Sequence, residues 1–165
     1  GRPLSGALVE TFEIGSHVPY TRTSSEAQGR FELEAAYRSH ALLRVARGDG
    51  FAPRIVPLTP AHYEAPLEIS LVSPGRLELV VESPPDVHLR GIEVFDDGTG
   101  HRVASRQLTR AARERHWVFT RLPVGRIRLE AVGTTPGGES WVGEARAEVV
   151  SGRTRRVRIP QAAAD

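Results

Sequence analysis

Proline and glycine interrupt this chain so often that long helices are excluded. Among its 165 residues are 12 Pro and 16 Gly, spread over the whole length, and few windows contain neither. Proline removes a backbone donor from a helix interior, and glycine costs about 1 kcal/mol there relative to alanine. Between these residues, apolar and polar side chains alternate with period two, and turn residues recur about every 8–12 positions. This pattern indicates an all-β sandwich or barrel.

The first half of the sequence has several expected strands and one proline-rich stretch. The strands are expected at residues 5–13, 17–23, 29–35, 41–47 and 67–72. Within the third of them, Phe31, Leu33 and Ala35 alternate with charged residues, so one face is expected to be buried and the other solvated. Four prolines make residues 51–66 a loop or an edge segment, because proline cannot donate to a ladder.

The second half is more regular, with about seven expected strands, a number typical of a sandwich. These strands are expected at residues 76–82, 91–95, 102–108, 117–120, 126–132, 141–149 and 154–159. Between the second and the third of them, residues 96–100 (Asp-Asp-Gly-Thr-Gly) are expected to form a hairpin turn. Residues 109–115 are the one place where a short helix is expected.

The two halves resemble each other loosely, which predicts two tandem modules, residues 1–73 and residues 74–165. In each half a strand with an aromatic residue, Phe31 or Phe119, precedes an apolar alternating strand, a Gly/Pro-rich loop and a last strand. Each half has its own apolar alternation and its own turns, as separate domains do. The alternative is a single larger sandwich of about 12 strands.

Turn and core motifs recur along the chain. They are GRPLSGALV at residues 1–9, GRFEL at 29–33 after the polar residues 21–23, GFAP at 50–53, FTRLPVG at 119–125, and an expected last hairpin with Val149, Gly152, Thr154 and Val157. These stretches resemble the carboxypeptidase regulatory-like domain, a transthyretin-like (prealbumin-like) Greek-key β-sandwich. Two tandem copies of this domain would together account for nearly the whole chain. It implies a fold rather than a function, because its motifs are turn and core residues.

The resemblance also implies that the first module lacks its opening strand. The family usually begins with a strand that runs into the glycine-proline segment, whereas this sequence starts at that segment, with Gly1 and Pro3. An unpaired sheet edge is an aggregation liability. We therefore expect upstream chain or a neighbouring strand to complete the first module.

All 22 basic residues are Arg, since Lys is absent, yet the net charge is only +2. Neither this small charge nor the few aromatic residues predicts a nucleic-acid partner. A group of arginines falls on the expected strands near the end of the second module: Arg126, Arg128, Arg153, Arg155, Arg156 and Arg158. If those strands are neighbours, their outward side chains form a stripe able to bind phosphate or carboxylate groups. The alternative is an ordinary solvated sheet face, with Glu144 and Glu148 as cross-strand partners.

Two aromatic residues are candidates for binding a glycan. Trp141 follows the segment Pro136-Gly137-Gly138, so it could lie at a loop rim and stack on a sugar; core packing is the alternative. Tyr63 lies in the proline-rich stretch. A carbohydrate-binding module that uses Trp141 or Tyr63 is therefore the first alternative function.

Catalytic and metal-binding patterns are weak. The six His residues do not pair at the spacing typical of metal sites, and Cys is absent. The best local cluster is His62-Tyr63-Glu64, so a metal-dependent hydrolase at His62 and Glu64 is the second alternative. The residues around Asp96 and Asp97 lack the further carboxylates of a calcium loop, which favours a β-turn. We expect no cofactor and no resident metal.

The sequence predicts a non-catalytic structural or interaction segment that presents surfaces to protein or glycan partners. The missing Lys and Asn, whose codons are AT-rich, indicate a GC-rich bacterial genome. We expect an extracytoplasmic location, in a periplasmic, secreted or cell-surface protein; a repeat pair of an adhesive fibre is one form this could take. No membrane span is expected, because no apolar run approaches the roughly 18 residues that a membrane helix needs.

Overall fold

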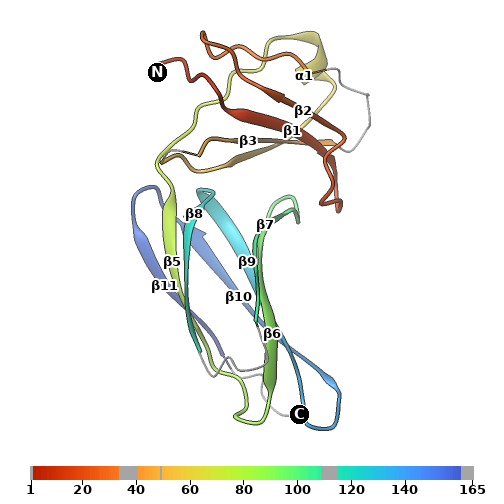
Figure 1. Ribbon diagram of the computed structural model, residues 1–165, viewed down its shortest axis with the longest axis vertical. Coiled ribbons are helices and arrows are strands. Elements are labelled where there is room, and N and C mark those ends of the chain that lie inside the picture. The colour runs from red at the N-terminus through yellow and green to blue at the C-terminus, as the bar shows by residue number, and fades with distance from the viewer. Residues whose placement is uncertain (1, 34–40, 49, 109–114, 161–165) are drawn as a thin grey trace.

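The computed structural model describes residues 2–33, 41–48, 50–108 and 115–160, which are built almost entirely of β-strands. The strands of these residues form three sheets, one in the first half of the chain and two in the second. Figure 1 shows the first-half sheet stacked on one end of the second-half sandwich, so the molecule is elongated. The all-β prediction is confirmed. Within the described ranges, no helix is long and apolar enough to cross a membrane.

The first half contributes one four-stranded antiparallel sheet. Its strands are β1 (Leu8–Glu13), β2 (Thr21–Ser24), β3 (Ala41–Ala46) and β4 (Arg54–Pro57), in the spatial order β2-β1-β3-β4. The edge strand β4 agrees with the prediction for the proline-rich stretch, since an edge strand tolerates residues that cannot donate to a ladder. A short helix, α1 (Ala61–Glu64), follows β4; the sequence did not predict it.

Two predicted strands of the first half do not form a ladder. Residues 67–72 and the described part of the predicted strand 29–35, residues 29–33, belong to no strand pair; residues 34 and 35 lie outside the described residues. Their side chains nevertheless alternate. The inward residues of both segments pack against Val9 and Val45 of the sheet: Phe31, Leu33, Leu67, Ile69 and Leu71. The predicted faces are present, but the predicted strands are wrong, because no described strand lies beside either segment.

The second half is a sandwich of two sheets. Its strands are β5 (Gly75–Val81), β6 (His88–Asp96), β7 (Arg102–Gln107), β8 (His116–Leu122), β9 (Gly125–Thr134), β10 (Ser140–Val149) and β11 (Thr154–Ile159). One sheet has the order β10-β9-β6-β7 and the other β11-β5-β8. Leu77, Leu79, Ile92 and Leu129 are fully buried between the sheets. The seven strands predicted for this half are confirmed.

The last two strands do not form the expected hairpin. β10 pairs with β9, whereas β11 pairs with β5 in parallel, so the turn between β10 and β11 carries the chain from one sheet to the other. Gly152 makes this turn with a φ of +66°, a conformation that favours glycine. The residues 149–157 therefore mark a sheet crossing. The helix expected at residues 109–115 lies outside the described residues, except for Arg115.

Hydrogen bonds tie the linker between the halves to both of them. The carbonyl of Val72 accepts from the backbone of Ala52 in the first half. The next two carbonyls, of Ser73 and Pro74, accept from the turn between β10 and β11 in the second half, from the side chain of Ser151 and the backbone of Gly152. Every described sheet takes its strands from one half, while the module boundary at residues 73 and 74 stays a prediction.

Candidate functional site

The two halves meet at a histidine of the second half. His101 follows the turn between β6 and β7 and is only 2% exposed. Its ring centroid lies 4.8 Å from that of Phe12 on β1 and 6.0 Å from that of His17. A further contact comes from Arg121 of β8, whose Nη2 donates to the carbonyl of Arg47 at 3.0 Å. Phe12, His17, Arg44 and His101 are called the junction below.

A buried carboxylate organises the first-half face of the junction. Glu10 of β1 is 1% exposed and lies opposite Arg22 of β2 and Arg44 of β3 in the strand register. Its Oε1 lies 2.7 Å from Arg22 Nη2, and its Oε2 lies 2.6 Å from Arg44 Nη2. The Arg44 guanidinium also lies 5.4 Å from the Phe12 ring centroid. Because a buried charge is costly without partners, the two arginines compensate the charge of the buried Glu10.

Electrostatics keep His101 neutral near pH 7. Burial lowers the pKa of His101, and the cations Arg44 and Arg102 and the ring of His17 lower it further, against an opposing effect of Asp96. The Nδ1 atom of His101 is buried and accepts or donates no hydrogen bond within the described structure. A small cleft of about 210 Å³ lies beside it, lined in part by Arg44 and Arg102. The junction therefore combines ring packing with a titratable group held in its uncharged form.

A larger cleft of about 480 Å³ lies in the first half, on the opposite face of the sheet from Glu10. Ala7, Val9 and Val45 form its floor, and the two segments without a ladder, residues 29–33 and 67–71, contribute its walls. Arg2, Pro3 and Leu4 also line it. This cleft was not predicted from the sequence.

The predicted arginine stripe does not form, because its strands are not neighbours. Arg126 and Arg128 lie on β9, whereas Arg156 and Arg158 lie on β11 in the other sheet. Arg153 and Arg155 lie just before and on β11. Arg156 Nη2 is 3.3 Å from Glu78 Oε2, and Arg158 Nη1 is 3.3 Å from Glu82 Oε1. Arg156 and Arg158 therefore have carboxylate partners on the neighbouring strand β5 and just beyond its end.

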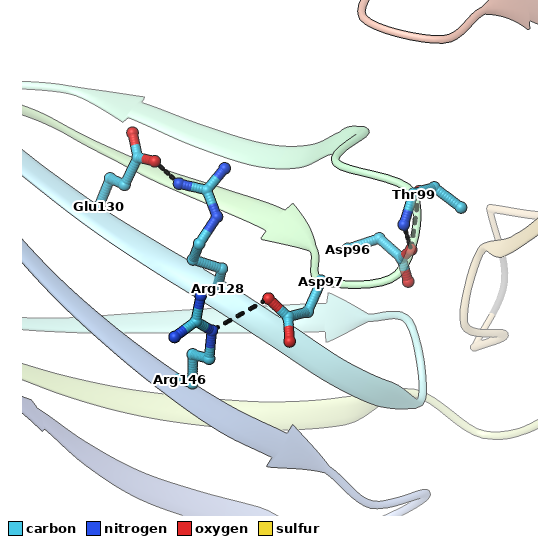
Figure 2. Close-up of polar contacts among 6 residues, drawn as sticks. All are labelled: Asp96, Asp97, Thr99, Arg128, Glu130 and Arg146. Atoms are coloured by element: carbon cyan, nitrogen blue, oxygen red, sulfur yellow. Dashed lines mark hydrogen bonds and ion pairs between the residues drawn. The ribbon is translucent and has the colours of Figure 1, made fainter.

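Two arginines of the sheet β10-β9-β6-β7 also have acidic partners (Figure 2). Arg128 forms an ion pair with Glu130, and its guanidinium lies 4.5 Å from the Phe95 ring centroid. Arg146 Nε donates to Asp97 Oδ1 at 3.2 Å. In the register Glu148 lies opposite Arg126, as the solvated-face alternative expects, whereas Glu144 lies opposite Glu130. Whether these arginines bind a partner stays a prediction.

The acidic turn is closed by its own side chains (Figure 2). Asp96 Oδ1 accepts from the backbone nitrogen of Thr99 at 2.9 Å and from its hydroxyl at 2.7 Å. The backbone nitrogen of Gly100 donates to the carbonyl of Asp96 at 2.8 Å. The hairpin turn predicted between β6 and β7 is confirmed. This carboxylate serves the turn by capping backbone donors.

The two aromatic candidates lie in different halves. Trp141 is 9% exposed and belongs to the core of the sandwich; a Cβ atom on Gly143 would approach its ring to 2.6 Å. This burial leaves little of the ring for stacking on a sugar. Tyr63 lies on α1 with 37% exposure. Glycan binding by either residue stays a prediction.

The histidine and glutamate of the hydrolase alternative lie on α1. The Nδ1 atom of His62 accepts from the backbone nitrogen of Thr59 at 3.0 Å, so the ring closes a local turn. Glu64 is exposed, and no described helix residue is buried. In the part of the chain that the structure describes, no three His, Asp or Glu side chains gather to hold a metal ion.

Sequence reasoning missed Glu10, Arg44 and His101, the polar residues of the junction. One signal was present: Val9 and Phe12 are apolar residues on opposite faces of β1, and this predicts a strand buried on both faces. A charged residue between them, Glu10, then requires a buried partner. Nothing local to His101 indicates that the turn of one half touches the sheet of the other.

No family model matches the chain, and no curated protein matches it significantly. Among solved structures, the chain is similar to GBS52, the minor pilin of Streptococcus agalactiae, at 12% identity and a TM-score of 0.48, over 98% of this chain and 84% of that chain. It is also similar to the Bacillus anthracis TIE protein at 13% identity and a TM-score of 0.38, over 97% and 31% of the two chains. A third similarity is to the shaft pilin SpaA of Lactobacillus rhamnosus GG, at 10% identity and a TM-score of 0.31, over 95% and 88%.

These similarities are too distant to support a function. The all-β sandwich follows from the strand pairing itself. The narrower resemblance to the carboxypeptidase regulatory-like domain stays a prediction, because no family model matches the chain.

Proposed function

We propose that the chain is a non-catalytic structural segment that transmits tension along a bacterial secreted or cell-surface protein. One observation carries the proposal: β5 and β11 are adjacent and parallel. β5 begins next to the linker from the first half, and β11 is the last strand of the second half. Tension along the chain therefore enters and leaves the sandwich through these two neighbouring strands.

The parallel pairing determines how such tension acts on the hydrogen bonds. Tension pulls the first residue of β5 toward the first half and the last residue of β11 in the opposite direction (Figure 1). The two strands then slide lengthwise, and all their hydrogen bonds resist together. A pair pulled apart from one end would instead break one bond at a time. Forced unfolding is governed by the rate of unfolding, and therefore by the free-energy barrier that separates the folded state from the unfolded one. This barrier is expected to be higher when many hydrogen bonds must break together than when they break one after another.

The β5–β11 pair is held by backbone hydrogen bonds along its length and by side-chain contacts on both of its faces. The register runs from Thr154 opposite Arg76 to Ile159 opposite Val81. Beyond it, the backbone nitrogen of Glu82 donates to the carbonyl of Ile159 at 2.8 Å. On the inner face Leu77, Leu79, Val81 and Ile159 are buried, and on the outer face Glu78 and Glu82 pair with Arg156 and Arg158. Sliding would disrupt all of these contacts.

The proposal also covers the source, the location and the partners of the chain. The absence of Lys and Asn supports a bacterial source. An extracytoplasmic location fits the geometry, since a chain anchored at a cell surface experiences tension. Protein or glycan partners on the outer faces belong to the same proposal, and a contact surface of this kind is compatible with a non-catalytic role.

Single-molecule force spectroscopy tests the proposal directly. Because the chain lacks Cys, two introduced cysteines serve as unique attachment points. In the variant S73C/P160C the force acts on the start of β5 and on the end of β11, at opposite ends of the strand pair. In the matched variant S73C/T154C the force acts at one end of the pair, because Thr154 is the exposed first residue of β11, opposite Arg76 near the start of β5.

We expect the second half to unfold at a clearly higher force in S73C/P160C than in S73C/T154C at the same loading rate. Thermal unfolding of the two variants before attachment checks that both are equally folded. Equal unfolding forces in the two geometries would contradict a tension-bearing role for this strand pair.

A further inference from the structure

The two halves of the molecule share the arrangement of one sheet. In the first half the order is β2-β1-β3-β4, and in the second it is β7-β6-β9-β10. In both, the first strand in chain order pairs with the second and the third, and the fourth lies at the edge beside the third. All these pairs are antiparallel. The second half can therefore serve as a template for the first.

The other sheet of the second half has the order β11-β5-β8, with β5 at its centre. β5 is parallel to β11 and antiparallel to β8. In the first half, residues 29–33 lie between the second and third strands of the chain, as β8 does in its half. Residues 67–71 follow the fourth strand, as β11 does. Residues 29–33 and 67–71 of the first half therefore correspond to the two outer strands of this sheet, β8 and β11. No described strand of the first half corresponds to the central strand β5.

The cleft of about 480 Å³ lies at this place. Phe31 and Gly29 line it from one flank, and Ile69 and Leu71 line it from the other. Its floor is the apolar face of the sheet that carries Val9 and Val45. In the second half the same region is filled by the inward side chains of β5, which are at most 2% exposed. In the first half the inward residues of both flanks are only half-buried.

We propose that this cleft is the seat of an extended strand that leads into Arg2 from the same polypeptide. The strand would run parallel to residues 67–71 and antiparallel to residues 29–33, as β5 runs between its own neighbours. Its backbone would bond to both flanks, and its alternate side chains would fill the cleft, which is the chemistry of strand addition to a sheet. The proposal does not depend on the role in transmitting tension.

The path of the chain favours a strand of the same polypeptide over a separate one. In the second half, residues 82–87 connect β5 to β6. In the first half, residues 2–7 lead into β1, and Arg2, Pro3 and Leu4 line the cleft itself. Ser25 fixes this segment, since its hydroxyl donates to the Leu4 carbonyl at 2.6 Å and accepts from the backbone nitrogen of Ala7 at 2.9 Å. A strand upstream of Arg2 thus reaches the cleft through a connection as short as the one after β5.

The template also specifies the side chains of the occupant. β5 has the sequence GRLELVV, with Leu77, Leu79 and Val81 buried and Arg76 exposed. The strand in the first-half cleft should likewise carry apolar residues at alternate positions, facing Val9 and Val45. Polar residues should occupy the intervening positions, which face water.

The experiment adds seven residues, GRLELVV, directly before Gly1 of the whole chain. The matched control adds GRSESVS, which replaces the three inward apolar residues and preserves length and charge. Amide hydrogen exchange is measured for residues 29–33 and 67–71, with the strands of the second half as an internal reference. We expect the apolar extension to slow exchange in both flanks by about tenfold or more relative to the control, as newly formed ladder bonds do. Exchange in the second half should not change, and the extended chains should have the same oligomeric state as the chain without an extension.

Three outcomes would overturn the proposal. Equal exchange in the flanks with the two extensions would show that no strand enters the cleft. Dimers formed in proportion to the gained protection would show that a second copy supplies the strand. Equal protection by free GRLELVV peptide at micromolar concentration would assign the cleft to a separate polypeptide.

Discussion

The two halves of this chain have the same four-stranded sheet but differ in what covers it. In the second half a complete second sheet covers the apolar face, and Leu77 and Leu79 of β5 are 0% exposed. In the first half the cover consists of residues 29–33 and 67–71, whose inward side chains stay half-buried beside an open cleft. Alternation of apolar residues thus determines which face of a segment is buried. A ladder forms only where a partner strand is present.

The largest difference between the halves should appear when one core side chain is shortened in each. Leu79→Ala removes buried atoms from a closed core and should lower the free energy of unfolding of the second half by about 3 kcal/mol. Ile69→Ala removes atoms beside the open cleft and should cost the first half about 1 kcal/mol. Both free-energy changes are measured by urea unfolding, with amide hydrogen exchange used to monitor each half separately. Equal costs would show that the first half has a core as closed as that of the second.

The buried carboxylate of Glu10 contacts two arginines of the first-half sheet. Glu10→Gln removes the negative charge between Arg22 and Arg44 and should lower the free energy of unfolding by about 2 kcal/mol. Glu13→Gln, on the same strand but exposed, is the control and should change it by no more than about 0.5 kcal/mol. Thermal unfolding at pH 7 compares the two variants. If Glu10→Gln lost as little stability as Glu13→Gln, the ion pairs of Glu10 with the two arginines would not stabilise the sheet.

The junction should weaken in acid because of His101. The unfolded chain takes up a proton near the ordinary pKa of histidine, about 6.5, whereas burial, Arg44 and His17 lower the pKa of His101 in the folded protein. Below about pH 6.5 the unfolded chain therefore binds more protons, and stability falls as the pH decreases toward the lowered pKa. Small-angle scattering and thermal unfolding at pH 7.5 and pH 5 should show a looser, less stable molecule at pH 5.

Two substitutions separate His101 from other groups that titrate in this range. His101→Gln should reduce the difference between pH 7.5 and pH 5, since the uncharged amide takes up no proton. His88→Gln changes an exposed histidine on β6 and should leave the difference as it is. If His101→Gln retained the full pH dependence, the loss of stability in acid would not come from His101.

The smallest effect is expected on the outer face of β11. The Arg158 and Glu82 side chains are 71% and 46% exposed, so their ion pair is largely screened by water. Arg158→Ala should change the free energy of unfolding by less than about 0.5 kcal/mol. A urea titration measures this change, and a loss above 1 kcal/mol would show that the outer face stabilises the sandwich more than solvated pairs do.

The sequence predicted the second half far better than the first, for a physical reason. In β9 and β5 the alternation of side chains, the bounding glycines and a real partner strand all agree, so the local pattern was sufficient. Around Phe31 and Ile69 the same local pattern occurs without a described partner, and no local signal distinguishes the two cases.

The candidate sites were harder to predict because they depend on distant contacts. The arginine stripe required β9 and β11 to be neighbours, which sequence order suggested and the crossing at Gly152 prevents. The burial of Trp141 depends on Gly143 making room for its ring two residues along the same strand. The contact of His101 with Phe12 joins residues far apart in the chain, and no short window contains both.

The hydrogen bonds of the linker have a consequence for how this protein can be cut or extended. Three successive carbonyls, of Val72, Ser73 and Pro74, accept hydrogen bonds from the first half and then from the second. A protease needs several residues of freely extended backbone, and an inserted domain needs a loop whose ends can move apart. The linker provides neither, so it is a poor place for proteolytic cleavage or for inserting foreign sequence, although it lies between the two halves.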